Sequence, residues 1–365
     1  MLKKKKVLCI GAGFGGIAAA LRLRAKGFDV QLIDRLPKLG GRAQVFEKEG
    51  FIFDGGPTVL TAPFLFEELF QLFNKKINDY VEILPLDLWY RYQFDDGKSL
   101  DYGRDLMRLF NDIEKFNPRD VEGYKKLLKF SEAIFDVGFQ KLSDQPFSSM
   151  KPLLKALPSM IKLKSYKSVY SLVSSFIEDD YLRKAFTISP LLVGGNPFNT
   201  TSIYALIHFL ERKWGVHFPK GGTNSVGLAL KRLMEEEGID IKLNTSIKEI
   251  LVKNGKAQGA ICDSGEKFEA DIVVVNGDPA YTYKNLFPHL KRKKWTDEKI
   301  DKLTFSMGLF VLYFGTNIEY PDIPHHTILF GKTYKELLSD IFDSKILSND
   351  LSLYLHRPSA TDRSF

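Results

Sequence analysis

The feature that most constrains this fold is a glycine-rich turn between a short apolar segment and a helical one. Residues 7–10 read VLCI, an apolar run typical of a buried parallel strand. Gly11, Gly13 and Gly16 follow in G-x-G-x-x-G spacing, with Ala12, Phe14 and Gly15 between them. This spacing predicts a tight turn, close approach of the backbone to a pyrophosphate, and close packing of the next helix. The phosphates would lie at the helix N-terminus, where free N–H groups and the helix dipole favour an anion.

The residues after this turn complete a nucleotide-binding unit. An Ala- and Leu-rich helix is predicted over 17–26, and Gly27 ends it. A second strand over 30–33 leads to Asp34, which lies 18 residues after Gly16, where an acid binds ribose hydroxyls. Arg35 follows directly and is included in the predicted site. Because strand, helix, second strand and acid fall in register, the sequence predicts a dinucleotide ligand rather than a glycine-rich turn without one.

A second glycine segment narrows the cofactor to FAD. Gly40, Gly41 and Arg42 follow Asp34, whereas an NAD dehydrogenase would proceed to its next βαβ unit. The segment resembles the flavin amine oxidase and carotenoid desaturase superfamily, in which an arginine lies over the FAD pyrophosphate. The planar fork of Arg42 suits that role; the alternative is an arginine on a surface loop. A hairpin over 45–53, turning at Glu49-Gly50, then leads to further predicted cofactor residues: Gly55, Gly56, Pro57 and Thr58.

Composition sets the class of protein. The chain has 365 residues, 44% of them hydrophobic, which suffices for two domains or one elaborated domain. Its net charge of +7 would suit nucleic acid or an anionic membrane, but no nucleic-acid recognition motif accompanies the charge. Cys9 and Cys262 are expected to be inert core residues in a reducing cytosol. No apolar stretch approaches the length of a bilayer span, so we expect any membrane contact to be peripheral.

The middle of the chain is predicted to be helical, with helices over 121–137 and 181–188. Residues 145–177 contain no acid, but they do contain five lysines and a broad apolar face. That composition is typical of an interfacial helix, and the alternative is an amphipathic helix that covers the core. The lysines are Lys151, Lys155, Lys162, Lys164 and Lys167.

A second nucleotide-binding half is predicted after residue 213. A helix over 225–237 precedes a strand, a small meander and a Val-rich strand over 272–275. Asn276 ends that strand, and backbone near Ile247 is expected to contact adenine. We therefore expect an α/β fold, with a Rossmann-like FAD-binding domain and an inserted helical and sheet domain for substrate and membrane. The predicted boundaries are 1–103 and 214–285 for FAD binding, 104–213 for the insertion, and 286–365 for an incomplete substrate sheet.

Several long stretches make the chain similar to the bacterial-type phytoene desaturases of carotenoid biosynthesis. They include VLCIGAGFGGIAAALRL, FDGGPTVLT, FNPRDVEGY, WGVHFPKGG, LFVLYFG and SLYLHRP. The resemblance implies FAD-dependent desaturation of phytoene to more conjugated carotenes such as lycopene. It also implies a lipophilic polyene substrate, a peripheral position on the cytoplasmic side of a membrane, and a quinone or oxygen as electron acceptor. Because the family continues beyond this point, we expect the chain to be a fragment that is inactive alone, rather than a complete natural protein.

No residue pattern identifies a catalytic group. A nucleophile elbow is absent, and the six histidines lack the spacing of a metal motif. His325 and His326 are adjacent, and neighbouring strand residues point to opposite faces, so no metal site is predicted. The cofactor must carry the reaction, in an apolar slot drawn from 57–61, 191–198 and 214–218. A diapophytoene (C30) desaturase, a carotenoid isomerase, a flavin amine oxidase and a non-catalytic carotenoid carrier remain as alternatives.

Overall fold

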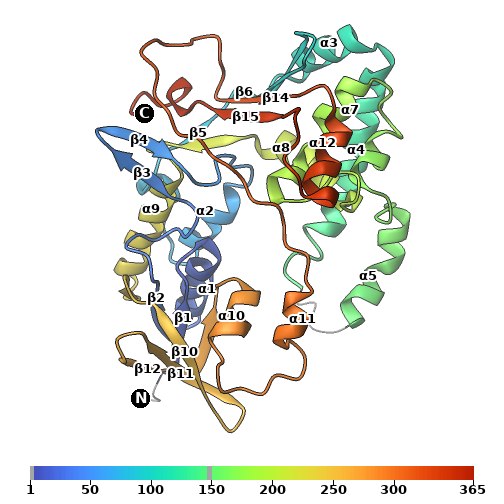
Figure 1. Cartoon of the computed structure of the whole chain (residues 1–365). Coiled ribbons are helices and arrows are strands. Elements are labelled where there is room, and N and C mark those ends of the chain that lie inside the picture. Colours follow the sequence, from blue (N-terminus) through green and yellow to red (C-terminus); the bar gives the residue numbers. More distant parts are fainter. Residues whose placement is uncertain (1–3, 146–149) are drawn as a thin grey trace. The chain divides into compact units, whose positions relative to one another are not determined.

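The computed structural model describes residues 4–145 and 150–365 (Figure 1). The chain forms two compact units, and each includes two long segments of sequence. The first unit holds the residues up to Leu84 together with Phe218–Phe305 and Ser364–Phe365, and the second holds Pro85–His217 and Ser306–Arg363. Residues 88–103 lie in the second unit because they join its sheet, whereas the sequence predicts a boundary after residue 103. The functional division of the chain stays a prediction.

The first unit is built on a parallel sheet of four strands in the order β13-β1-β2-β9. Strand β1 is central and pairs Val7 with Ile272 on one side and with Val30 on the other. Helix α1 (Phe14–Ala25) connects β1 to β2, as a crossover between parallel strands requires. The strands are β1 Lys6–Ile10, β2 Asp29–Ile33, β9 Asp240–Lys242 and β13 Ile272–Val275.

The remaining elements of the first unit match the predicted pattern. A hairpin forms at the expected place and turns at Glu49 and Gly50, whose φ angles are 53° and 85°. A three-stranded antiparallel meander follows β9, as predicted. The elements are β3 Val45–Lys48, β4 Phe51–Asp54, α2 Phe64–Gln71, η1 Ile77–Asp79, α9 Thr223–Glu236, β10 Ile247–Lys253, β11 Lys256–Cys262, β12 Lys267–Glu269, α10 Pro279–Asn285 and α11 Asp297–Asp301. Strands β5 Ile83–Pro85 and β8 His217–Pro219 lie where the chain passes between the units.

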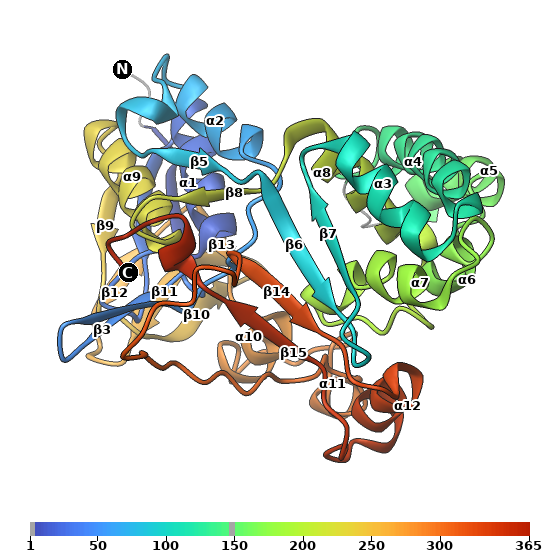
Figure 2. The same cartoon turned by 90° about the horizontal axis from the view of Figure 1, so that it is seen from above.

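The second unit combines a mixed sheet with a group of helices (Figure 2). The strand order is β15-β14-β6-β7, and only the β14–β6 pairing is parallel. The strands are β6 Leu88–Gln93, β7 Ser99–Gly103, β14 His326–Leu329 and β15 Leu353–His356. The helices are α3 Leu106–Phe116, α4 Arg119–Gly138, α5 Met150–Lys162, α6 Val169–Val173, α7 Asp180–Phe186, η2 Ser189–Val193, η3 Ser202–Ala205, α8 Leu206–Trp214, α12 Tyr334–Ser339, the π-helical η4 Asp340–Ser344 and η5 Pro358–Ala360.

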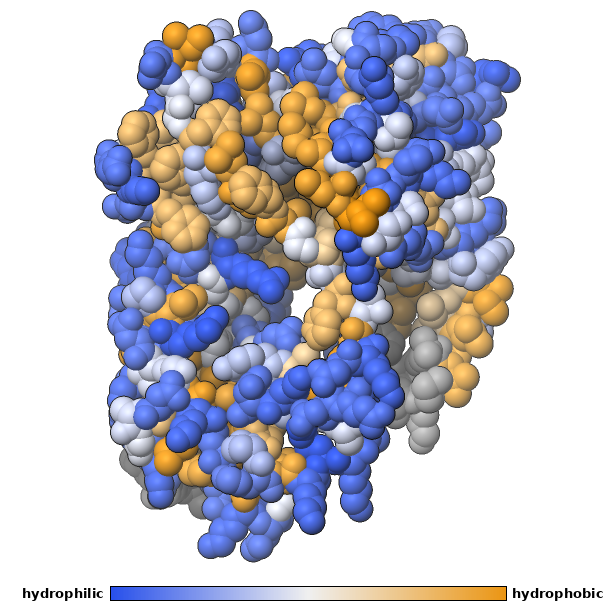
Figure 3. All heavy atoms as spheres, in the orientation of Figure 1, coloured by the Kyte–Doolittle hydropathy of each residue, from blue (hydrophilic) through white to orange (hydrophobic). Residues whose placement is uncertain are grey.

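The acid-free segment 145–177 is helical where it is described, in α5 and α6. Residues 146–149, and the side chains of 150–153, lie outside the described residues. Leu154, Leu157 and Ile161 on α5 are 60%, 45% and 58% exposed, and Figure 3 shows apolar atoms gathered over this helix at the right-hand edge. Helix α5 therefore presents an apolar face to solvent instead of burying it. Among the described helices, none combines the length and the apolar character needed to cross a bilayer.

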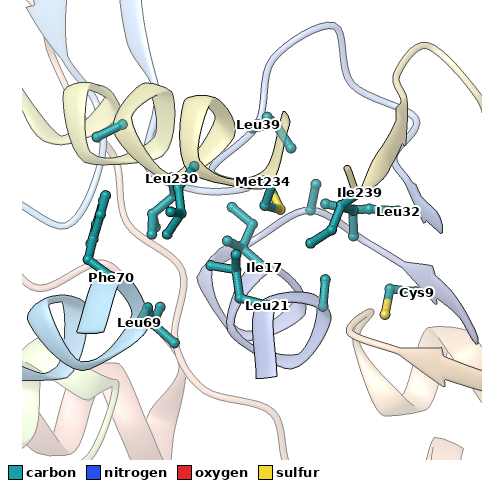
Figure 4. Close-up of a cluster of buried hydrophobic side chains, with 14 of the residues drawn as sticks. Cys9, Ile17, Leu21, Leu32, Leu39, Leu69, Phe70, Leu230, Met234 and Ile239 are labelled. Carbon is teal, nitrogen blue, oxygen red and sulfur yellow. The ribbon is translucent and has the colours of Figure 1, made fainter. Parts of the chain in front are cut away.

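Side chains on the two faces of β1 enter two different cores. Val7 and Cys9 pack with α1, α2 and α9 on one face, whereas Leu8 and Ile10 pack with the meander on the other. Figure 4 shows the first of these clusters, in which Ile17 and Leu21 of α1 lie between Leu230 of α9 and the sheet. Most of these side chains are fully buried, so the N-terminal end of α1 is fixed against the ends of the parallel strands.

A polar cluster is buried between β6, β7, α4 and α8 in the second unit. Tyr90 donates to Glu211 Oε1 at 2.9 Å, and the Arg212 guanidinium lies 4.4 Å from the centroids of both Trp89 and Tyr102. Arg212 also donates to the Gly103 carbonyl at 2.6 Å. Burial raises the pKa of the Glu211 carboxyl to about 7. The folded protein is therefore more stable when Glu211 is protonated.

Replacing Glu211 with Gln should change how stability depends on pH. The folded-state pKa of Glu211 lies above the unfolded value of 4.5, so its stabilising effect is present below pH 4.5 and is lost as the pH rises to about 7. The free energy of unfolding of the wild type, measured against that of Glu211→Gln, should fall over this range by on the order of 3 kcal/mol. Denaturant titrations at several pH values measure this difference.

Two comparisons isolate the effect of Glu211. Burial lowers the pKa of His208 to about 4, so His208 has the opposite effect and flattens the total pH profile. Both proteins contain His208, and the difference between them therefore cancels its contribution. The exposed Glu132→Gln on α4 is the matched control for exchanging a carboxyl group for an amide. A difference between the wild type and Glu211→Gln that stays constant with pH would contradict the assignment.

Candidate flavin site

The glycine turn lies at the carboxyl end of the parallel sheet, where β1 ends. Gly11 donates its N–H to the Ile33 carbonyl at 2.8 Å, and Asn276 donates to the Ile10 carbonyl at 2.8 Å. The carboxyl ends of β1, β2 and β13 are therefore joined by hydrogen bonds at one edge of the sheet. A Cβ atom at Gly16 would collide with the Gly11 carbonyl oxygen, so only glycine allows α1 to begin this close to the turn.

The Gly-Gly-Arg segment lies directly against the glycine turn. Gly40 donates to the Ala12 carbonyl at 2.8 Å and forms an isolated parallel bridge with Gly13. Gly41 has a φ of 62°, and a Cβ atom there would lie 2.9 Å from the Cα atom of Gly13. The structure thus brings together the two glycine segments that sequence reasoning connected only through their shared cofactor. Arg42 follows in an exposed position, as does Arg35.

The N-terminus of α1 suits an anion. Gly13 is the N-cap residue, no side chain caps the helix, and no acid lies in its first turn. The first N–H groups of the helix therefore lack the side-chain acceptors that usually satisfy them. The Asn276 side chain lies over the same turn, because a Cβ atom at Gly15 would be 2.6 Å from its Oδ1 atom.

Asp34 directly follows β2 and is buried beside the glycine turn. Its Oδ2 atom accepts from the Ala12 N–H at 2.5 Å, and its Oδ1 atom accepts from the Leu36 N–H at 2.8 Å. The Asp34 carbonyl accepts from Thr245, two residues before Ile247 at the start of β10. The predicted ribose-binding acid, the glycine turn and the predicted adenine-contacting backbone are thus neighbours in this unit. Ribose binding by Asp34 stays a prediction.

Three residues that sequence reasoning missed hold these loops in place. Asn224 donates from Nδ2 to the carbonyls of Leu39 and Ala43 at 3.0 and 2.8 Å, on both sides of Gly-Gly-Arg. Asp54 accepts from the N–H and the hydroxyl of Thr223 at 2.8 and 2.9 Å. The sequence marks Asp54 and Thr223 only by their positions next to glycines, since Asp54 precedes Gly55 and Thr223 follows Gly222 at the start of α9.

The predicted residues 55–58 lie beside the start of α9. Gly55 donates to the Gln44 carbonyl at 2.9 Å, and Gly56 donates to Asp54 Oδ1 at 3.1 Å. Pro57 accepts from the Thr223 hydroxyl at 3.1 Å, and Thr58 follows it in the chain. A Cβ atom at Gly56 would lie 2.8 Å from the Cα atom of Ala43, so this segment also packs against the Gly-Gly-Arg loop.

Cysteine and histidine side chains could carry chemistry other than flavin binding. The cysteine at position 9 lies as predicted, but the histidines do not. Cys9 is buried, and burial raises the pKa of its thiol to about 11, which agrees with an inert core residue. The argument that His325 and His326 must point apart is wrong. His325 precedes β14, outside regular strand geometry, and one ring nitrogen from each of His325, His326 and His356 lies within 4.8 Å of those of the others.

Comparison with known proteins agrees with this geometry. Residues 14–319 match the family model described as flavin containing amine oxidoreductase. The chain is 45% identical over 360 residues to the lycopene-forming phytoene desaturase of Pseudescherichia vulneris, covering 99% of this chain and 73% of that protein. It is 44% identical to the corresponding Pantoea ananas enzyme, with the same coverage. A 4,4'-diapophytoene desaturase of Methylomonas is 32% identical, covering 100% of this chain and 71% of that protein.

The fold is also found among solved structures. An oxidoreductase from Methanosarcina mazei aligns with a TM-score of 0.52 and 22% identity, covering 78% of this chain and 62% of that one. The chain belongs to the family of flavin-containing amine oxidoreductases. It is an FAD-dependent oxidoreductase with a mixed α/β fold, as the sequence predicted.

The residues of the first unit fit FAD. The uncapped start of α1, the close contact of Gly13 with Gly41, and the exposed Arg42 provide backbone donors and a cation beside one another in sequence and space. When bound, FAD supplies the acceptor for the hydride that the substrate loses. The residues of this site would bind and orient the dinucleotide, and this assignment stays a prediction.

Replacing Gly13 with Val should prevent FAD retention. The φ and ψ of Gly13 are −71° and 168°, which Val adopts readily, so the change acts through its side chain in the space over the turn. Loss of a charge-assisted hydrogen bond to phosphate costs about 1.5–3 kcal/mol, and we expect FAD binding to weaken by about tenfold or more. FAD titration of the flavin-free protein, followed by flavin fluorescence, measures this loss.

The matched control is Gly308→Val. Gly308 has no neighbour within 4 Å of an added Cβ atom and no positive φ, so the same substitution there should leave FAD binding unchanged. Thermal unfolding of both flavin-free variants shows whether folding is retained. Normal FAD affinity in a folded Gly13→Val protein would place the pyrophosphate elsewhere.

Proposed function

We propose that this protein desaturates phytoene, forming more conjugated carotenes such as lycopene with FAD as the hydride acceptor. The observation that carries the proposal is the identity of 45% and 44% to two lycopene-forming phytoene desaturases over 99% of the chain. The 32% identity to a diapophytoene desaturase is lower, which favours the C40 substrate over the C30 one. The contact between the glycine turn and the Gly-Gly-Arg segment in the first unit supports FAD as the cofactor.

Each desaturation removes two hydrogens from neighbouring carbons of the polyene. One leaves with its electron pair as a hydride, and the other leaves as a proton, so a new carbon–carbon double bond forms. The chain's contribution is to hold the acceptor by the turn at Gly13, the Gly40–Gly41 segment and Asp34, and to bind a lipophilic substrate. A membrane quinone or oxygen then removes the electrons from the cofactor.

We also propose that the protein docks peripherally on the cytoplasmic face of an anionic membrane, because its substrate dissolves in lipid. Leu154, Leu157 and Ile161 lie at helical spacing on α5 and are exposed, and Lys155 and Lys162 are exposed on the same helix. Exposed apolar side chains beside lysines, in a segment without acids, fit the headgroup region of anionic lipids.

Desaturation should be visible as coupled changes in two absorption bands. With phytoene in liposomes and stoichiometric FAD-loaded protein under anaerobic conditions, we expect the oxidised flavin band to bleach while a longer-wavelength polyene spectrum appears. Mass spectrometry of the product should show loss of hydrogen in pairs. The same assay with diapophytoene tests the choice of substrate length.

Three outcomes of this assay would contradict the proposed reaction. A product that forms without flavin bleaching means that FAD does not accept the hydride. A polyene with an unchanged hydrogen count indicates a carotenoid isomerase. Bleaching by amines, with no reaction of phytoene, indicates an amine oxidase. The flavin-free Gly13→Val protein is the negative control and should give no product.

Reversing the charge of Lys155 and Lys162 should weaken membrane binding. A lysine near an anionic surface contributes about 1 kcal/mol, so the double change to Glu should reduce co-sedimentation with phosphatidylglycerol vesicles by about tenfold or more. Added salt should weaken the wild-type interaction in the same direction.

The matched control for this experiment is the double change of Lys126 and Lys129 to Glu. Both lysines are exposed on α4, so the net charge changes equally while the apolar face of α5 is untouched. Lys164 is left unchanged, because its ammonium lies 5.9 Å from the Phe130 ring centroid and contributes to packing. Equal losses for both double variants would show that net charge, and not α5, governs binding.

A further inference from the structure

Three histidines converge in the sheet of the second unit, and none of them is assigned to the flavin. His325 and His326 are 3% and 0% exposed, and His356 is half-buried. One ring nitrogen from each lies within 4.8 Å of those of the other two. The Nε2 atoms of His325 and His356 are 3.0 Å apart.

The register of two strands produces this convergence. His326 of β14 and His356 of β15 are direct partners in an antiparallel pair, so their side chains lie on the same face. Their rings are stacked, with centroids 5.4 Å apart and planes 19° apart. His325 precedes β14, accepts the Arg357 N–H with its carbonyl at 2.8 Å, and places its ring 4.9 Å from that of His356.

Hydroxyl groups hold the far side of two of these rings. His325 Nδ1 lies 2.6 Å from the Thr361 hydroxyl, and His326 Nδ1 lies 2.7 Å from the Tyr354 hydroxyl. If each Nδ1–H donates to its hydroxyl, Nε2 carries the lone pair, which is the arrangement that orients histidine ligands in metal sites.

One nitrogen of the cluster lacks a hydrogen-bond partner. His326 Nε2 is buried, and no described residue donates to it or accepts from it. A buried polar atom without a partner costs about 1–3 kcal/mol, so a native structure normally provides something for it to bind. Both nitrogens of His325 and the Nδ1 atom of His326 have partners at 2.6–3.0 Å, which leaves His326 Nε2 as the unexplained atom.

We propose that His325, His326 and His356 bind a divalent transition-metal ion, with Zn²⁺ as the metal that suits this donor set. Three neutral imidazoles without a carboxylate or thiolate favour Zn²⁺ over Mg²⁺ or Ca²⁺, which prefer oxygen ligands. Tetrahedral Zn²⁺ with nitrogen at 2.0–2.1 Å requires ligand atoms about 3.3 Å apart, so the rings need only small shifts. A solvent molecule completes the coordination on the half-buried side of His356.

Bound Zn²⁺ would join β14, β15 and the Thr361 turn through one ion. It would satisfy the lone pair of His326 Nε2 and replace the contact between two Nε2 atoms, which can share only one proton. The metal would therefore stabilise this edge of the sheet. It takes no part in hydride transfer.

Calorimetric titration of the metal-stripped protein with Zn²⁺ tests the proposal. We expect saturable binding of a single equivalent, a rise in the thermal unfolding temperature, and no such response to Mg²⁺. X-ray absorption at the zinc edge should show imidazole ligands at about 2.0 Å. His356→Gln and His325→Gln should each weaken Zn²⁺ binding by about tenfold or more, since one of three ligands is lost.

His289→Gln is the matched control, because the His289 side chain is 84% exposed and lies in the other unit. It should bind Zn²⁺ as the wild type does. The proposal is overturned if the wild type binds no Zn²⁺ saturably, if His356→Gln binds it equally well, or if the absorption spectrum shows oxygen ligands only. The titration and the absorption spectrum of the wild type test Zn²⁺ binding without any variant. A variant that fails to fold therefore does not prevent a decision.

Discussion

The contact between two glycine segments determines the geometry of the candidate flavin site. Gly13 and Gly41 approach so closely that a Cβ atom at Gly41 would lie 2.9 Å from the Cα atom of Gly13, and the Gly40 N–H donates to the Ala12 carbonyl across the same gap. Backbone N–H groups and the helix dipole can act on a phosphate only if no side chain intervenes. The rest of the first unit, from the parallel sheet to α9, holds these two loops at that separation.

The sequence predicted the local elements of this unit, together with its cofactor. The period of the apolar residues and the glycine spacing identify β1, α1, β2 and the meander, because these signals arise within short windows. Asn224 and Asp54 could not be found in this way. Each acts on backbone groups far away in the sequence, and an isolated Asn or Asp carries no sign of such a partner.

The prediction for the histidines failed for a different reason, because a correct rule was applied to a residue that lies outside the strand. Alternation of side chains holds within a strand, but His325 lies before β14 and its ring is free of that constraint. His356 joins the pair only through the register of β14 with β15. Cross-strand register depends on the whole sheet, and one sequence does not specify it.

The same separation of local and distant effects bears on how much of the sequence this fold requires. The Methanosarcina mazei oxidoreductase has the fold at 22% identity, so most aligned side chains differ between the two chains. In this chain the backbone approaches at Gly16 and Gly41 are the ones that a side chain would disrupt, since a Cβ atom at either position would lie within 3.0 Å of another segment's backbone. In the second unit, the buried cluster around Glu211 and Arg212 depends instead on particular side chains, because a Tyr90 hydroxyl, a carboxyl and a guanidinium must all be present for its hydrogen bonds to form.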